Sequence, residues 1–115
     1  MNRTISLLAL ATTLALSSAA NAAGNIENGK KLAEPCAQCH GKDGNSIDPQ
    51  YPRLAGQYRD YLEIALQQYK DGTRKNAIMA PFVEPLNKQN MLDLAAYFAS
   101  LPDSKLGDLS HPPKK

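Results

Sequence analysis

The five residues Cys36-Ala37-Gln38-Cys39-His40 form the most specific pattern in the chain: two cysteines separated by two residues and followed directly by a histidine. On a helical turn, positions i, i+3 and i+4 share one face, so both thiols and the imidazole can reach one flat macrocycle. In covalent haem attachment, two thiols add across the porphyrin vinyl groups and the histidine ligates the iron. We therefore predict that Cys36 and Cys39 hold one haem c and that His40 is an axial ligand of its iron.

Three other uses of the cysteines compete with haem attachment. A plain disulfide is common for a cysteine pair in an exported protein, but it gives the adjacent histidine no role. A thioredoxin-like redox pair belongs in a βαβ context, and the chain shows no alternating strand pattern. A structural zinc site needs four ligands, whereas the sequence has no third cysteine and its only other histidine is His111. The motif favours haem over all three.

The second axial position of a haem iron needs a further ligand. Met79 lies in an irregular segment, residues 76–81, where a loop can present a thioether to the far face of the haem. Met91 is the competing methionine, but it falls on or near the apolar face of a predicted helix, where methionine more often fills the core. His111 stands in a proline-rich tail and is left out. We predict Met79 as the second axial ligand.

The start of the chain has the features of an export signal. Arg3 supplies a basic start, an apolar run follows at residues 5–16, and small residues then fit a cleavage site. We predict residues 1–22 as a signal peptide that is removed, residues 23–102 as one cytochrome-like domain and residues 103–115 as a mobile tail. No further apolar run approaches the roughly 20 residues of a membrane helix, so we expect a soluble protein of the periplasm.

Charge and size argue for a small carrier domain and against a nucleic-acid partner. The sequence has 13 basic and 11 acidic residues, a formal net charge of +2, and losing Arg3 with the signal leaves +1. The remaining chain of about 90 residues is near the lower limit for a self-sufficient core, so a buried cofactor would add useful apolar contacts. We expect a monomer whose partners are redox proteins that dock transiently.

Apolar periodicity predicts an all-α fold. We expect three main helices, at residues 26–34, 57–71 and 88–101. Pro35 is expected to end the first helix, Gly72 to stop the second and Asn87 to cap the third. The connecting segments at residues 41–56 and 72–86 contain too much glycine and proline for one long regular element.

Taken in order, these features resemble class I c-type cytochromes. The stretches that carry the likeness are Pro52-Arg53-Leu54-Ala55-Gly56-Gln57, Tyr61-Leu62, Gly72-Thr73-Arg74 and Leu94-Ala95-Ala96-Tyr97-Phe98. They are similar to small bacterial cytochromes of the c553 kind and to half-domains of dihaem relatives, although only one haem motif is present here. The resemblance implies the class I cytochrome c fold, with three to five helices around one covalently bound haem.

The resemblance also implies roles for individual residues. The carbonyl of Pro52 would accept a hydrogen bond from the second ring nitrogen of His40, which fixes the tautomer of that ligand. Gly29 would let the first helix cross closely against the last one near Tyr97, with Leu32 as a packing residue. The remaining candidates for contacts with the haem edge or its propionates are Tyr51, Arg53, Gln57, Tyr58, Arg59, Tyr61, Tyr69, Arg74 and Asn76.

Two filled axial positions indicate electron transfer. With His40 and Met79 as ligands, the iron moves little when its charge changes, and the thioether favours the ferrous state. We predict a periplasmic protein, not an enzyme, that shuttles single electrons between redox partners of a respiratory chain. The alternative is haem-based small-ligand binding or peroxidase activity at an open sixth site. A third interpretation is an electron-transfer subunit held permanently by a larger dehydrogenase or oxidase.

Overall fold

The computed structural model describes residues 23–107, which contain five α-helices joined by turns and loops. They are α1 (Ile26–Leu32), α2 (Glu34–His40), α3 (Arg59–Asp71), α4 (Ala80–Val83) and α5 (Lys88–Ser100). No strand occurs in this part, which confirms the all-α prediction. Nor is any of these helices long and apolar enough to cross a membrane. The predicted signal peptide and His111 lie outside the described residues.

Local chemistry explains where the three main helices begin and end. The side chain of Asn25 accepts the N–H of Asn28 at 2.9 Å and so caps α1. Asn87 and Asn90 form a reciprocal capping box at the start of α5, as the predicted cap at Asn87 requires. α3 ends at Gly72, whose φ of 80° lies in the left-handed region. The predicted helices are therefore present, with boundaries shifted by one or two residues.

Two short helices differ from the sequence prediction. Pro35 does not end a helix but stands in the first turn of α2. The missing N–H of proline costs nothing there, because N–H groups of the first turn have no acceptor within the helix. The residues from Cys36 to His40 are consequently helical, as the shared-face argument requires. A second proline, Pro81, likewise stands in the first turn of α4. This helix lies inside a segment whose composition predicts irregular structure.

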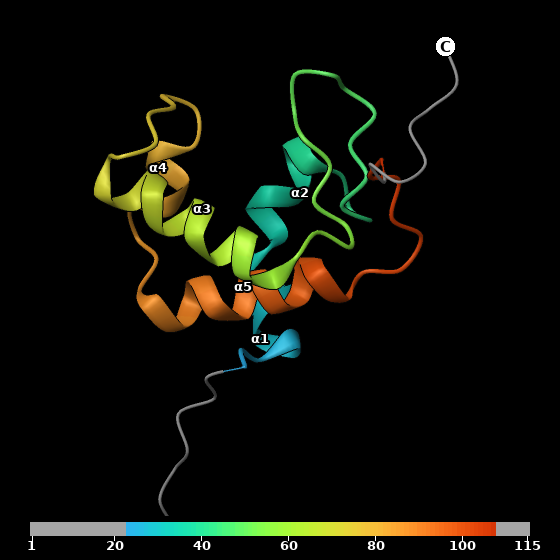
Figure 1. Ribbon diagram of the computed structural model, residues 1–115, viewed down its shortest axis with the longest axis horizontal. Helices are drawn as coiled ribbons and strands as arrows, with labels where there is room; N and C mark the ends of the chain where they lie inside the picture. Colours follow the sequence, from blue (N-terminus) through green and yellow to red (C-terminus); the bar gives the residue numbers. More distant parts are fainter. Residues whose placement is uncertain (1–22, 108–115) are drawn as a thin grey trace, which may run out of the picture.

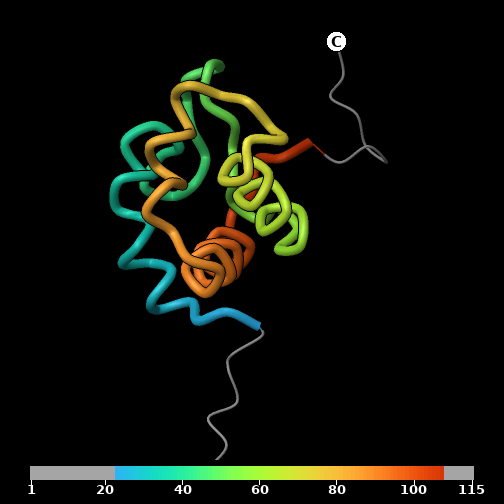
Figure 2. Tube along the Cα trace, turned by 90° about the vertical axis from the view of Figure 1, so that its left-hand side faces the viewer, coloured from blue at the N-terminus to red at the C-terminus, as the bar shows by residue number. Residues whose placement is uncertain are grey.

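Helix α5 lies between α1 and α3 and contacts both (Figures 1 and 2). At the crossing with α1, a Cβ added to Gly29 would stand 2.0 Å from the carbonyl oxygen of Asp93 and 2.8 Å from Cβ of Tyr97. The two backbones are thus in direct contact, which confirms the predicted role of Gly29. Leu32 is partly buried and packs against the core, as expected.

A buried carboxylate, which the sequence analysis did not identify, fastens α1 to α5. Asp93 is 2% exposed and accepts the N–H of Asn25 at 2.7 Å, the side-chain amide of Asn28 at 2.6 Å and that of Gln89 at 2.8 Å. Burial opposes ionisation of Asp93, but the hydrogen bonds outweigh it and hold its pKa below the ordinary value. The carboxylate is therefore charged and satisfied in the folded protein.

Candidate haem site

A cavity of about 310 Å³ is lined by residues of α2, of the loop that follows it, of α3 and of α4. From α2, the cavity is lined by Cys36, Cys39 and His40. Met79, the residue that directly precedes α4, lines it as well. The core residues Leu94 and Phe98 of α5 also line it. Residues from two distant parts of the sequence thus meet at one cavity.

His40 is oriented by the loop after α2. It is 6% exposed, and its Nδ1 lies 2.8 Å from the carbonyl oxygen of Pro52. Because a carbonyl oxygen only accepts, Nδ1 is the donor in this bond, and Nε2 is the nitrogen with the lone pair in the corresponding neutral tautomer. The ring of Tyr51 meets the imidazole edge-on, with centroids 6.5 Å apart. The contact implied by the resemblance is present and leaves Nε2 available to a metal.

The two cysteines are free and partly buried, one helical turn apart. Burial raises the pKa of the Cys36 thiol, so this group stays protonated at neutral pH. Catalytic redox thiols have the opposite property, a lowered pKa. The raised pKa of Cys36 does not favour a thiol–disulfide redox pair.

Met79 stands in a turn that Asn76 organises. The side-chain oxygen of Asn76 accepts the N–H of Ile78 at 2.9 Å and that of Met79 at 3.1 Å, and its backbone carbonyl accepts the N–H of Ala80 at 3.0 Å. Met91, in contrast, is 3% exposed in α5 and is not among the residues that line the cavity. From the sequence, Asn76 was expected only as a haem contact. An asparagine three residues before the methionine was the signal for this turn.

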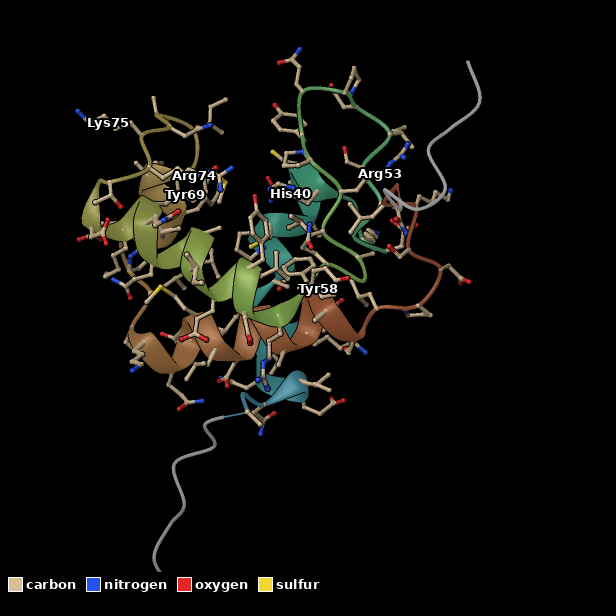
Figure 3. All side chains as sticks on the ribbon, viewed as in Figure 1. His40, Arg53, Tyr58, Tyr69, Arg74 and Lys75 are labelled. Atoms are coloured by element: carbon tan, nitrogen blue, oxygen red, sulfur yellow. The ribbon has the colours of Figure 1, made fainter. Side chains whose placement is uncertain are left out.

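The other predicted contact residues separate into two groups. Tyr58, which is 82% exposed, and Arg59 do not line the cavity. Those that do are Tyr51, Arg53, Gln57, Tyr61, Tyr69, Arg74 and Asn76. Figure 3 shows Tyr69 and Arg74 on the α3 side of the space and His40 on the α2 side.

The start of the predicted tail also contributes to the site. The side chain of Asn45 accepts the N–H of Lys105 at 2.9 Å and donates to the carbonyl of Asp103 at 3.1 Å. Arg53 donates to the carbonyl of Lys105 at 3.0 Å, and Leu106 lines the cavity. These contacts hold residues 103–107 against the loop that follows α2.

The donor set and the lining fit a covalently bound haem. Two free thiols, one imidazole nitrogen and one thioether are the groups that attach and ligate such a cofactor. Most of the remaining lining is apolar or aromatic, which suits a flat macrocycle. Fold and site together define a helical haem-binding domain with a single attachment motif.

Comparison with known proteins supplies the family. Residues 26–102 match the cytochrome c family, and the chain belongs to that family. The chain is 44% identical over 94 residues to cytochrome c4 of Pseudomonas aeruginosa, a match that covers 82% of this chain and 47% of that protein. It is 40% identical over 81 residues to cytochrome c-554(548) of Halomonas halodenitrificans, covering 68% of this chain and 98% of that protein.

A solved structure agrees with the sequence relatives. The crystal structure of reduced recombinant cytochrome c4 from Pseudomonas stutzeri matches with a TM-score of 0.66 at 41% identity, over 69% of this chain and 46% of that one. The chain therefore spans about half the length of the cytochromes c4 that it matches. Its fold is that of a class I cytochrome c domain, and its cofactor is one covalently bound haem c, both as predicted.

Proposed function

We propose that this protein is an electron carrier in which His40 and Met79 are the two axial ligands of the haem iron. The observation that carries the proposal is that His40, with a free Nε2, and Met79 line the same cavity. Similarity to cytochrome c4 and cytochrome c-554(548) supports electron transfer over the alternative of ligand binding or peroxidase activity at an open sixth site.

Each residue of the site has a separate task in this proposal. Haem c supplies the one-electron couple of its iron. Cys36 and Cys39 would attach the cofactor through thioether bonds, and the carbonyl of Pro52 holds the Nδ1 proton of His40 so that Nε2 would be free to ligate the iron. The thioether of Met79 and the apolar lining both disfavour the additional positive charge of the ferric state, so they raise the reduction potential.

The proposal extends to location and partners. Residues 1–22 direct export, and the processed protein works in the periplasm without a catalytic activity of its own. Its partners are redox proteins that dock briefly, one giving and one accepting an electron. A protein held permanently in a larger complex would instead copurify with that complex, which makes native purification the test of this point.

Optical spectra of the holoprotein test the ligand set. The protein is made in a host that attaches haem, and Met79→Leu is compared with the matched variant Met91→Leu. The charge-transfer band of a ferric iron–thioether bond is expected in the wild type and in Met91→Leu, and is expected to be absent from Met79→Leu. Both substitutions conserve volume, so packing changes little in either protein.

Two results would contradict this assignment. A band that survives in Met79→Leu would mean that another residue ligates the iron. A high-spin wild-type spectrum, together with carbon monoxide binding as rapid in the wild type as in Met79→Leu, would mean that the sixth position is open. The second result would favour the ligand-binding or peroxidase alternative.

A further inference from the structure

The permanent charges on the cavity wall are all of one sign. Arg53 and Arg74 are the two arginines among the lining residues, and no Asp, Glu or Lys lines the cavity. A haem carries two propionate carboxylates, and carboxylates that leave water need hydrogen-bond donors or cations. A wall with positive charge and no negative charge is therefore complementary to the anionic edge of this cofactor.

Two of the three arginines considered from the sequence are already engaged elsewhere. Arg53 donates from Nε to the carbonyl of Ser46 at 3.3 Å and from Nη1 to that of Lys105 at 3.0 Å, so it ties the loop to the segment after α5. Arg59 lies outside the cavity, where its Nε is 3.5 Å from the carboxylate of Asp60. Of the two arginines that line the cavity, Arg74 is the one whose side chain does not donate to a backbone carbonyl within residues 23–107.

Arg74 is held in place by two tyrosines rather than by an acid. Its Nη1 donates to the hydroxyl of Tyr61 at 3.4 Å, and its Cζ lies 4.9 Å from the ring centroid of Tyr69. The bond to Tyr61 raises the pKa of Arg74, so the guanidinium remains charged. Within residues 23–107 no carboxylate forms an ion pair with Arg74. Its charge is thus oriented but not neutralised.

We propose that Arg74 binds a propionate carboxylate of the haem, with Tyr61 and Tyr69 as positioning residues. Tyr61, Tyr69 and Arg74 all line the cavity, and Figure 3 shows Tyr69 and Arg74 beside α3, across from His40 on α2. A fixed positive charge near the iron opposes its oxidation, so Arg74 raises the reduction potential. The proposal requires the bound haem, and its redox readout relies on the electron-transfer function proposed above.

The test compares three variants of the holoprotein. Arg74→Gln removes the charge from the cavity wall, Arg74→Lys keeps the charge without the planar fork, and Arg59→Gln removes the same charge outside the cavity. We expect Arg74→Gln to lower the equilibrium constant for reduction of the haem iron by about fivefold to tenfold. A tenfold change corresponds to 59 mV for one electron. Arg59→Gln should change that equilibrium constant by less than about twofold because its charge is exposed to solvent.

A vibrational readout distinguishes carboxylate binding from a general electrostatic effect. In reduced-minus-oxidised infrared difference spectra, the propionate carboxylate bands should shift in both Arg74→Gln and Arg74→Lys and stay in place in Arg59→Gln. Because Arg74→Lys keeps the charge, this comparison also decides the question if Arg74→Gln does not mature. Tyr61→Phe should give a smaller shift of the same kind, since it removes only the hydroxyl that orients the guanidinium.

Several outcomes would overturn the proposal. Equal potential shifts in Arg74→Gln and Arg59→Gln, or unshifted carboxylate bands in both Arg74 variants, would show that Arg74 does not bind a propionate. Slower electron transfer from Arg74→Gln at an unchanged potential would make Arg74 a docking residue for a partner instead. Retention of the iron–thioether band in every variant separates these results from a failure of the ligand assignment, which that band tests independently.

Discussion

The crossing of α1 and α5 and the turn before Met79 are built in opposite ways. At the crossing, Gly29 brings two backbones into contact and the buried carboxylate of Asp93 joins segments 68 residues apart. The turn is held by local bonds to Asn76, and its neighbour Ile78 is 53% exposed. The crossing therefore depends on contacts between distant segments, whereas the turn that holds the proposed ligand depends on hydrogen bonds between near neighbours.

This contrast predicts that the two regions respond differently to substitution. Changes at the crossing should lower the free energy of unfolding and leave the iron spectrum of the folded fraction intact. Changes in the turn should alter iron ligation with a small loss of stability. The variants below are ordered by the size of the effect expected on the free energy of unfolding.

Gly29→Val should be the most damaging single change. The added side chain meets the carbonyl group of Asp93, which is backbone and cannot move aside, so α1 must separate from α5. We expect a loss of about 3 kcal/mol or more, measured by urea unfolding of the holoprotein. Gly107→Ala is the control, because nothing lies within 4 Å of its added Cβ. Equal stability of the two variants would refute the backbone contact.

Asp93→Asn should have the next largest effect at neutral pH. The amide keeps one acceptor oxygen but replaces the other with an NH2 group, which then faces at least one of the donors on Asn25, Asn28 and Gln89. Loss of a charged acceptor in a buried site should lower the free energy of unfolding by about 2 kcal/mol. The ferric charge-transfer band of the folded protein should not change. A weakened band at full stability would mean that α5 controls the ligand directly.

The carboxylate of Asp93 should also make the free energy of unfolding depend on pH. Because the pKa of Asp93 is lower in the folded protein, its contribution is complete above the unfolded value of about pH 4 and is lost as the pH falls through the folded value. Urea titrations of the wild type between neutral pH and pH about 3 should therefore show a decline that is shallower in Asp93→Asn. Parallel curves for the two proteins would show that Asp93 does not titrate differently on folding.

Of the three substitutions, Asn76→Ala should lower the free energy of unfolding least and alter the ligation of the iron most. It removes the acceptor of the N–H groups of Ile78 and Met79, which should lower the free energy of unfolding by about 1 kcal/mol. The iron–thioether band should weaken, and carbon monoxide should bind faster than in the wild type. Asn76→Asp keeps an acceptor oxygen and should preserve the band. A band unaffected by Asn76→Ala would show that Met79 is positioned by other contacts.

Sequence reasoning was most accurate where the signals were local. The spacing of Cys36, Cys39 and His40 predicts a shared helical face, and α2 provides it. Apolar periodicity located α1, α3 and α5, because amphipathic spacing is a property of neighbouring residues. The prediction that Pro35 ends the first helix was wrong, because a proline that cannot continue one helix is also well suited to the first turn of the next.

What the sequence by itself determined, then, was the attachment motif and the all-α class, whereas the close helix crossing at Gly29 was implied by the family resemblance. Only the tertiary structure decided which residues meet: that Asp93 receives donors from α1, that His40 and Met79 line one cavity, and that Arg74 rather than Arg59 lines it as well. The physical reason is that these outcomes depend on contacts between residues far apart in the chain. Periodicity and spacing report which face a side chain occupies, but not which partner lies across from it.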